Sequence, residues 1–276
     1  MSRIRFRAAP VFRRSAVARR WRCWLGLLVA VLAAAPLIDA VASSDVAMPW
    51  HDAQQMVLVI TPQWSSTQGV MRAYARVDGS WREVGPANAV VIGHAGAGWG
   101  LGLHPAQSDG PDKKEGDGRS PAGVFRIGTA FGYAASANTA LRYRALRDSD
   151  WCIDVSGSPH YNRIVDAEQV GAAAVAGATE PMRRDLHFHG DQGYRIGFVI
   201  EHNWQQAPMG GSCIFGHLWH SPSSTTTGCT AMAPQTMTTL LAWLDPRRHP
   251  VFVLLPQGQY TRLHKAWNLP VVDSGR

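Results

Sequence analysis

The sequence has few charged residues, no internal repeat and, after its N-terminal segment, no second apolar run of the roughly 18 residues that a membrane span needs. Charged residues make up 17% of the 276 positions and hydrophobic residues 46%, a balance that excludes a disordered chain. Without a repeat or a clear internal boundary, we expect a single folded domain over residues 43–276.

The charge distribution removes one class of partner. The formal net charge is +7, which by itself favours a protein that binds nucleic acid or a membrane surface. However, residues 1–42 contain eight arginines, no lysine and one acid, Asp39, so this segment carries the whole excess. The other 234 residues have 19 basic and 19 acidic side chains, so we expect no nucleic-acid partner.

Residues 1–42 have the pattern of a secretory signal peptide. An arginine-rich start precedes an apolar run of about 15 residues from Trp24 to Ile38, and residues 40–42 form an A-x-A cleavage site. The alternative is an uncleaved signal anchor, in which case this leader alone would contact the membrane. Both interpretations predict export to the cell envelope, either periplasmic or extracellular.

Only three cysteines follow the leader: Cys152, Cys213 and Cys229. Three cannot all pair within one chain, and in an oxidising compartment the odd cysteine is a candidate reactive thiol. By parity alone, Cys152 and Cys213 are disulfide candidates that would leave Cys229 free. Cys213 precedes an apolar strand, however, and fits a buried core thiol equally well.

Strand patterns dominate the rest of the chain. Asp78-Gly79 separates two alternating runs, 70–77 and 80–84, and this pattern predicts a β-hairpin. Further strands are predicted over residues 56–61, 89–92, 124–127, 194–200, 214–219 and 250–255. The spacing of apolar residues predicts a helix over 234–244, the alanine-rich stretch 166–178 a short helix, and the polar stretch 105–121 an exposed loop.

One loop has the residue types of a thiol nucleophile. Thr226-Thr227-Gly228-Cys229 lies between a strand and a helix, and His217 on that strand precedes the cysteine by twelve residues. A thiol needs a base nearby to react at neutral pH, and a strand histidine can face a cysteine on the returning loop. Gly228 permits close backbone approach, so the amides of Thr226, Thr227 and Gly228 are candidate oxyanion donors. The same spacing also suits a disulfide half or a packed thiol.

With its flanks included, the sequence resembles a divergent bacterial branch of the L,D-transpeptidase catalytic domain family. The resemblance covers roughly residues 56–256 and includes His217, the loop 226–229 and four flanking stretches: 115–125, 158–162, 194–203 and 211–215. The chain departs from the family at Thr227, where the family has histidine, and at Ala231, where it has arginine or asparagine. The interval from His217 to Cys229 is also shorter than in the family.

The resemblance implies a mainly β fold, a β-sandwich of mixed sheets with a few short helices. It also implies a cysteine acyltransferase that acts on peptidoglycan stem peptides, with Cys229 as nucleophile and His217 as the proton carrier. Backbone N–H groups near Gly228 and Cys229 would stabilise the oxyanion, and Thr226, Thr227 and Gly228 are the expected oxyanion or substrate-binding residues. A second stem amine as acceptor gives a cross-link, whereas water gives a carboxypeptidase. The family's reaction needs no cofactor and no metal, and the sequence does not indicate an oligomeric state.

Two other functions stay open at this stage. His187, His189 and His202 could form a zinc site in an envelope hydrolase, and His217 with His220 could add to it, although no H-E-x-x-H motif is present. The nine tryptophans outside the leader could instead stack on glycans in a non-catalytic wall-binding module.

Six further residues are candidates for substrate contact, with ordinary surface charge or core packing as the alternative for each. They are Arg163, Arg183, Arg184 and Arg195 for a substrate carboxylate, and Tyr161 and Trp219 as groove residues.

Overall fold

The computed structural model describes residues 48–272, and the leader predicted over 1–42 lies outside this range. Within it the fold is mainly β, with parallel and antiparallel pairings in the same sheet and a few short helices, which confirms the predicted fold class. None of the helices between residues 48 and 272 is long and apolar enough to span a membrane.

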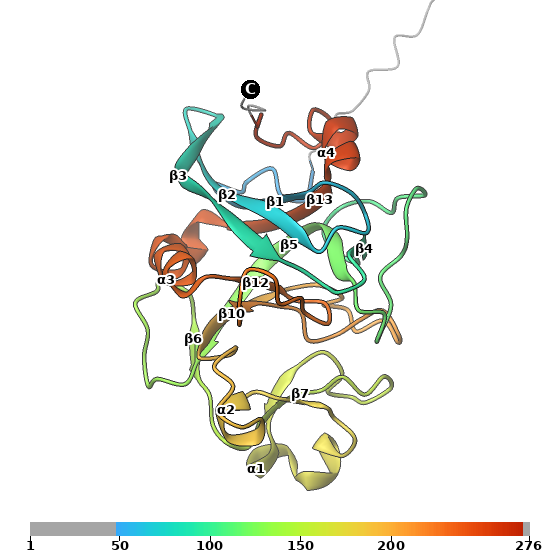
Figure 1. The fold of residues 1–276 in the computed structure, drawn as a ribbon, viewed down its shortest axis with the longest axis vertical. Helices are drawn as coiled ribbons and strands as arrows, with labels where there is room; N and C mark the ends of the chain where they lie inside the picture. The colour runs from blue at the N-terminus through green and yellow to red at the C-terminus, as the bar shows by residue number, and fades with distance from the viewer. Residues whose placement is uncertain (1–47, 273–276) are drawn as a thin grey trace, which may run out of the picture. The chain divides into compact units, whose positions relative to one another are not determined.

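The main sheet closes on itself. In the described residues its ladder runs β10-β11-β12-β3-β2-β1-β13-β5, and β5 pairs again with β10, so these eight strands form a closed circuit (Figure 1). Two short strands, β4 (Ala97–Trp99) and β6 (Tyr143–Ala145), pair with β5 outside the circuit. The circuit consists of β1 (Gln55–Thr61), β2 (Gln68–Val77), β3 (Ser80–Val91), β5 (Ser120–Gly132), β10 (Ile196–Ile200), β11 (Phe215–Leu218), β12 (Thr230–Met232) and β13 (Val251–Pro256).

Local sequence explains the strongest elements. Asp78 and Gly79 have φ angles of 50° and 76°, the left-handed conformation that a two-residue hairpin turn needs, so β2 and β3 form the predicted hairpin. The runs 80–84 and 89–92 were expected as separate strands, but β3 is continuous across them. β1 and β13 pair in parallel, and both are apolar along almost their whole length because they are buried on both faces.

A second, three-stranded sheet lies at the end of the domain away from β1 and β2 (Figure 1). It is made of β7 (Asp150–Cys152), β8 (Ile164–Asp166) and β9 (Glu180–Pro181). The predicted alanine-rich helix is present only as α1 (Ala167–Val170) and the 3-10 turn η1 (Ala172–Val175). α2 (Arg184–His187) follows β9 and brings Arg184 close to Glu180.

The C-terminal part follows the prediction closely. α3 (Pro234–Trp243) begins at Pro234 and buries Met237, Leu240 and Leu241, which are the residues of its apolar spacing. A 3-10 turn, η2 (Pro246–Arg248), leads into β13, and α4 (Gln257–Leu263) then packs against β1 and β13. The stretch 105–121 is only partly the exposed loop expected, because Lys113 and Ser120 within it are buried.

Candidate active site

Cys229 lies at the entrance to β12, beside the strand that carries His217. β11 and β12 pair in parallel, with Gly216 opposite Thr230 and His217 opposite Ala231. Extending this register by one residue places Cys229 opposite Phe215. His217 therefore lies two residues further along β11, a step of about 6.6 Å along a strand. The Cys229 side chain is buried, with 6% of its surface exposed.

Two hydroxyl groups hold the backbone of Cys229. The hydroxyls of Thr226 and Ser120 donate to the Cys229 carbonyl at 2.6 Å and 3.0 Å. The Thr226 hydroxyl also accepts the Gly228 N–H at 3.2 Å, so the Gly228 amide is used inside the loop. The Thr226 N–H donates to the Ile92 carbonyl at 3.0 Å, so of the predicted oxyanion donors the amide of Thr227 is left, next to that of Cys229 itself.

Gly228 is required by the shape of the loop. Its φ angle of 154° is one that residues with side chains rarely adopt, and an added Cβ would lie 3.1 Å from the Arg119 carbonyl oxygen. The glycine therefore lets the chain pass close to residue 119 and turn into β12.

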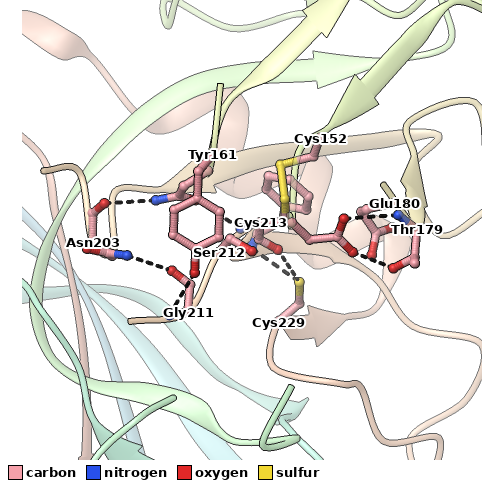
Figure 2. The surroundings of a disulfide bond; sticks show 12 residues. Cys152, Tyr161, Thr179, Glu180, Asn203, Gly211, Ser212, Cys213 and Cys229 are labelled. Atoms are coloured by element: carbon pink, nitrogen blue, oxygen red, sulfur yellow. Dashed lines mark hydrogen bonds between the residues drawn. A yellow bond between two sulfur atoms is a disulfide. The ribbon is translucent and has the colours of Figure 1, made fainter. Parts of the chain in front are cut away.

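The cysteine pairing suggested by parity is confirmed. Cys152 and Cys213 form a disulfide, and Cys229 is the free cysteine of the described residues. Figure 2 shows Cys229 beside this disulfide, with its sulfur directed at Cys213. The thiol donates to the Cys213 carbonyl at 3.4 Å, and the sulfur accepts the Phe215 N–H at 3.3 Å. The resting thiol proton is thus held by a backbone oxygen.

Two cavities meet at Cys229. One, of about 530 Å³, is lined by His217, Tyr194, Arg184 and His220. The other, of about 260 Å³, is lined by Lys113, Glu115, Asp154 and Gly228. Both share Cys229 and four other residues: His94, Thr179, Glu180 and Thr227. A larger cavity of about 710 Å³ lies over β1 and β2, but its mostly apolar lining lacks a nucleophile or base.

His217 is neutral in the resting site and has one ring nitrogen available. Its Nδ1 contacts the Leu218 carbonyl at 2.9 Å, so Nδ1 carries the hydrogen and Nε2 keeps its lone pair. Burial lowers the His217 pKa to about 4. Although Cys229 and His217 line the same cavity, their side chains do not hydrogen-bond to each other. The structure therefore brings the two predicted residues to one cavity without a hydrogen bond between them.

Burial likewise keeps the Cys229 thiol protonated. It raises the thiol pKa to about 12, and the negative charge of Glu180 adds to this effect. Three neighbours act in the opposite direction, namely the Phe215 N–H, the Tyr194 hydroxyl and the Arg184 cation. Both partners of the expected pair are thus neutral before substrate binds.

Sequence reasoning missed two of these neighbours as site residues. Glu180 forms an ion pair with Arg184 at 3.2 Å, and Arg184 also pairs with Asp191 at 2.8 Å. The Tyr194 ring packs at 5.4 Å from Phe215 and 5.2 Å from His217, measured between ring centroids. Tyr194 lay in a stretch of family resemblance, whereas no pattern pointed to Glu180 at the end of the alanine-rich segment.

The histidines of the zinc alternative do not form a ligand set. His187 and His189 are exposed, and His187 contacts Asp148 at 3.1 Å. His202 is buried, where it contacts the Leu101 N–H and the Gly210 carbonyl. Across residues 48–272 no three histidine, cysteine, aspartate or glutamate residues are grouped so that they could hold a metal ion.

The other candidates divide into two groups. Arg184 and Trp219 line the cavity of about 530 Å³ at Cys229, although Arg184 is already paired with two carboxylates. Arg163 and Arg195 are exposed elsewhere, and Arg183 pairs with Asp185. Tyr161 is a core residue whose hydroxyl bonds Glu115 and the Gly211 N–H.

Comparison of the chain with protein-family models, with curated proteins and with solved structures finds no match. The function therefore has to be argued from the site itself.

Proposed function

We propose that this chain is an exported cysteine acyltransferase that performs L,D-transpeptidation on peptidoglycan stem peptides and so cross-links or remodels the bacterial cell wall. The observation that carries the proposal is the position of the free thiol of Cys229 where two cavities meet, with His217 in one of them. A nucleophile in this position can hold an acyl donor on one side and receive an acceptor from the other.

In the proposed reaction the thiol proton of Cys229 passes to Nε2 of His217, and the sulfur attacks the carbonyl that joins the L-centre of a diamino acid to D-alanine. The tetrahedral intermediate expels D-alanine, whose nitrogen takes the proton from His217. The amine of a second stem peptide then attacks the thioester and releases Cys229. If water attacks instead, the product is that of a carboxypeptidase.

Substrate binding has to activate the thiol. In the resting site the Cys213 carbonyl accepts the Cys229 proton, and burial favours the neutral form. Rotation of the Cys229 side chain toward the cavity of about 530 Å³ would turn the sulfur away from this carbonyl and toward His217. A neutral imidazole with a free Nε2 is the form of histidine that can accept a proton there.

The test is to incubate the protein, as residues 43–276, with disaccharide-tetrapeptide muropeptides and to follow intact mass and products. We expect an acyl adduct on Cys229, release of D-alanine, and either a cross-linked dimer or a tripeptide. Cys229→Ala should abolish the adduct. His217→Asn should slow its formation about 100-fold or more, the usual contribution of a general base.

Each remaining outcome favours one of the alternatives. Processing that survives Cys229→Ala contradicts the transpeptidase proposal, and its loss on adding a chelator would favour the zinc hydrolase. Muropeptide binding without turnover, equal in the parent protein and in Cys229→Ala, would favour the wall-binding module.

A further inference from the structure

We propose that Tyr194 is a second catalytic residue of this site, whose hydroxyl donates a hydrogen bond to the Cys229 sulfur as the thiolate forms, and that Glu180 is a positioning residue that acts through Tyr194. This inference rests on the proposed cysteine chemistry, but it makes a claim about the thiol alone that can be measured without any wall peptide.

The position of Tyr194 is fixed by its ring. The side chain is buried between Phe131, Phe215 and His217, with ring centroids 5.7, 5.4 and 5.2 Å away. The Arg184 guanidinium lies over the ring at 5.2 Å. A tyrosine packed on all these sides can direct its hydroxyl only toward the cavity that it shares with Cys229 and Glu180.

Two acceptors compete for the one hydrogen of this hydroxyl. The Glu180 carboxylate and the Cys229 sulfur are both acceptors, and both line the cavity that Tyr194 lines; the Tyr194 hydroxyl is also one of the neighbours that lower the Cys229 pKa. A hydroxyl has one hydrogen to give, so donation to Glu180 withholds it from sulfur. When it is donated to sulfur, a charge-assisted bond stabilises the thiolate.

Glu180 is held at this position from two sides. It pairs with Arg184 at 3.2 Å, and in the three-stranded sheet it lies opposite Cys152. The disulfide links Cys152 to Cys213, whose carbonyl contacts the Cys229 sulfur. The backbone of Glu180 is therefore tied to the segment that contacts the thiol, and Arg184 holds its carboxylate.

In the reaction Tyr194 keeps its proton. The thiol proton passes to His217, the sulfur lone pair forms the C–S bond, the C–N bond breaks, and the amine nitrogen takes the proton from His217. Tyr194 stabilises the sulfur anion before attack and again when it becomes the leaving group of the second step. Tyr194 therefore increases the rate of acylation and does not strengthen substrate binding.

The experiment measures alkylation of Cys229 by iodoacetamide from pH 6 to 9.5, without reductant, by peptide mass spectrometry. Because only the thiolate reacts, Tyr194→Phe should slow alkylation about ten-fold at a given pH, the effect of losing one hydrogen bond to a charged group. Glu180→Gln should accelerate it, since it removes a negative charge beside the sulfur and leaves a neutral amide oxygen, a weaker acceptor for the Tyr194 hydrogen. Other titratable groups facing these cavities are His94, Lys113, Glu115, Asp154, Arg184, His217 and His220.

The opposite signs separate a chemical role from a structural one. Loosened packing would expose the thiol and accelerate alkylation in both variants, so faster reaction of Tyr194→Phe overturns the proposal, as does a rate equal to that of the parent. Tyr133→Phe is the matched control, because Tyr133 also packs against this cluster but its hydroxyl bonds the Asp191 carbonyl. Its alkylation rate should equal that of the parent.

The outcome is independent of the wall-peptide assay. If muropeptides give no adduct but Tyr194→Phe slows alkylation, the substrate proposal fails and the role of Tyr194 stands. If muropeptides acylate Cys229, Tyr194→Phe should lower kcat about ten-fold with KM unchanged. Acylation with an unchanged kcat in this variant would overturn the inference and leave the proposed function intact.

Discussion

A single carbonyl oxygen, that of Cys229, receives two hydroxyl donors, and this arrangement determines how the nucleophile is presented. Ser120 reaches it from β5, whereas Thr226 reaches it from within the loop, so β5 and the loop are joined at the nucleophile. Ser120 also accepts the Gly93 N–H at 3.0 Å, which leaves this buried hydroxyl fully used. The two side chains that hold the Cys229 carbonyl are thus neutral hydroxyls, whose loss changes no charge.

Thr226→Val should therefore impair the site without altering its electrostatics. It removes a donor to the Cys229 carbonyl and an acceptor for the Gly228 amide, so we expect the free energy of unfolding to fall by about 1–3 kcal/mol. Formation of the acyl adduct should slow by about ten-fold or more. Urea unfolding and adduct mass spectrometry measure the two effects.

Thr226→Ser is the control, because it keeps the hydroxyl and should retain most of both stability and adduct formation. Equal behaviour of the valine and serine variants would show that the hydroxyl does not hold the loop.

The site residues divide by the kind of signal that they leave in the sequence. Cys229 could be identified because three cysteines cannot all pair, and because a glycine precedes it in a threonine-rich loop. Tyr194 and Glu180 could not, since each approaches Cys229 from another part of the chain. Their roles depend on which elements the fold brings beside β11, and no local pattern encodes that.

At the scale of elements, the disulfide connects the small sheet to the main one. Cys152 is in β7, whereas Cys213 lies just before β11 and has a left-handed φ angle of 56°. β7 has three residues and β9 has two, so the strands form too few hydrogen-bonded pairs for this sheet to be stable alone. The covalent link therefore supplies stability that these short strands lack.

Removal of the disulfide by the double substitution Cys152→Ser and Cys213→Ser should cost about 4 kcal/mol of unfolding free energy, because it opens a loop of 61 residues. We expect adduct formation at Cys229 to fall with it, since Cys213 positions the thiol. Denaturant unfolding and adduct yield are the measurements. The double variant leaves no new thiol that could pair with Cys229, and full activity in it would contradict this role of the bond.

Strong, long patterns were the predictable elements. The hairpin of β2 and β3, the buried strands β1 and β13 and helix α3 each had either a turn signal or a sustained spacing. β7, β8 and β9 escaped prediction because two or three residues give no measurable period. The expected helix of 166–178 is divided into α1 and η1 at Gly171, whose φ angle of 87° is not helical.

For the molecule as a whole, buried neutral histidines limit the stability of the fold at acidic pH. His104 and His202 lie in the interior, where burial lowers their pKa values to about 4 and about 3, and burial in the candidate site lowers that of His217 to about 4. In the unfolded chain a histidine has a pKa of about 6.5. Above that pH both states hold neutral imidazoles. Below it, the unfolded chain binds protons that the folded chain cannot.

The free energy of unfolding should therefore fall as the pH drops from about 6.5 to about 4, by up to about 1.4 kcal/mol per pH unit for each of the three histidines. Urea unfolding at pH 7, 6 and 5 measures the slope. His202→Gln should start from lower stability, because it disturbs the contacts of His202 with Leu101 and Gly210. Its dependence on pH should be flatter than that of the parent, and an identical slope would contradict this account.

The parallel pairing of β1 with β13 has a consequence for the order in which the molecule is made. Met56 lies opposite Val251, so the first strand of the circuit has to wait for a strand that is synthesised long after it. Pairing across so many residues is slow, because a long loop has to be closed before the contacts stabilise it. The circuit therefore cannot close until β13 is available to pair with β1.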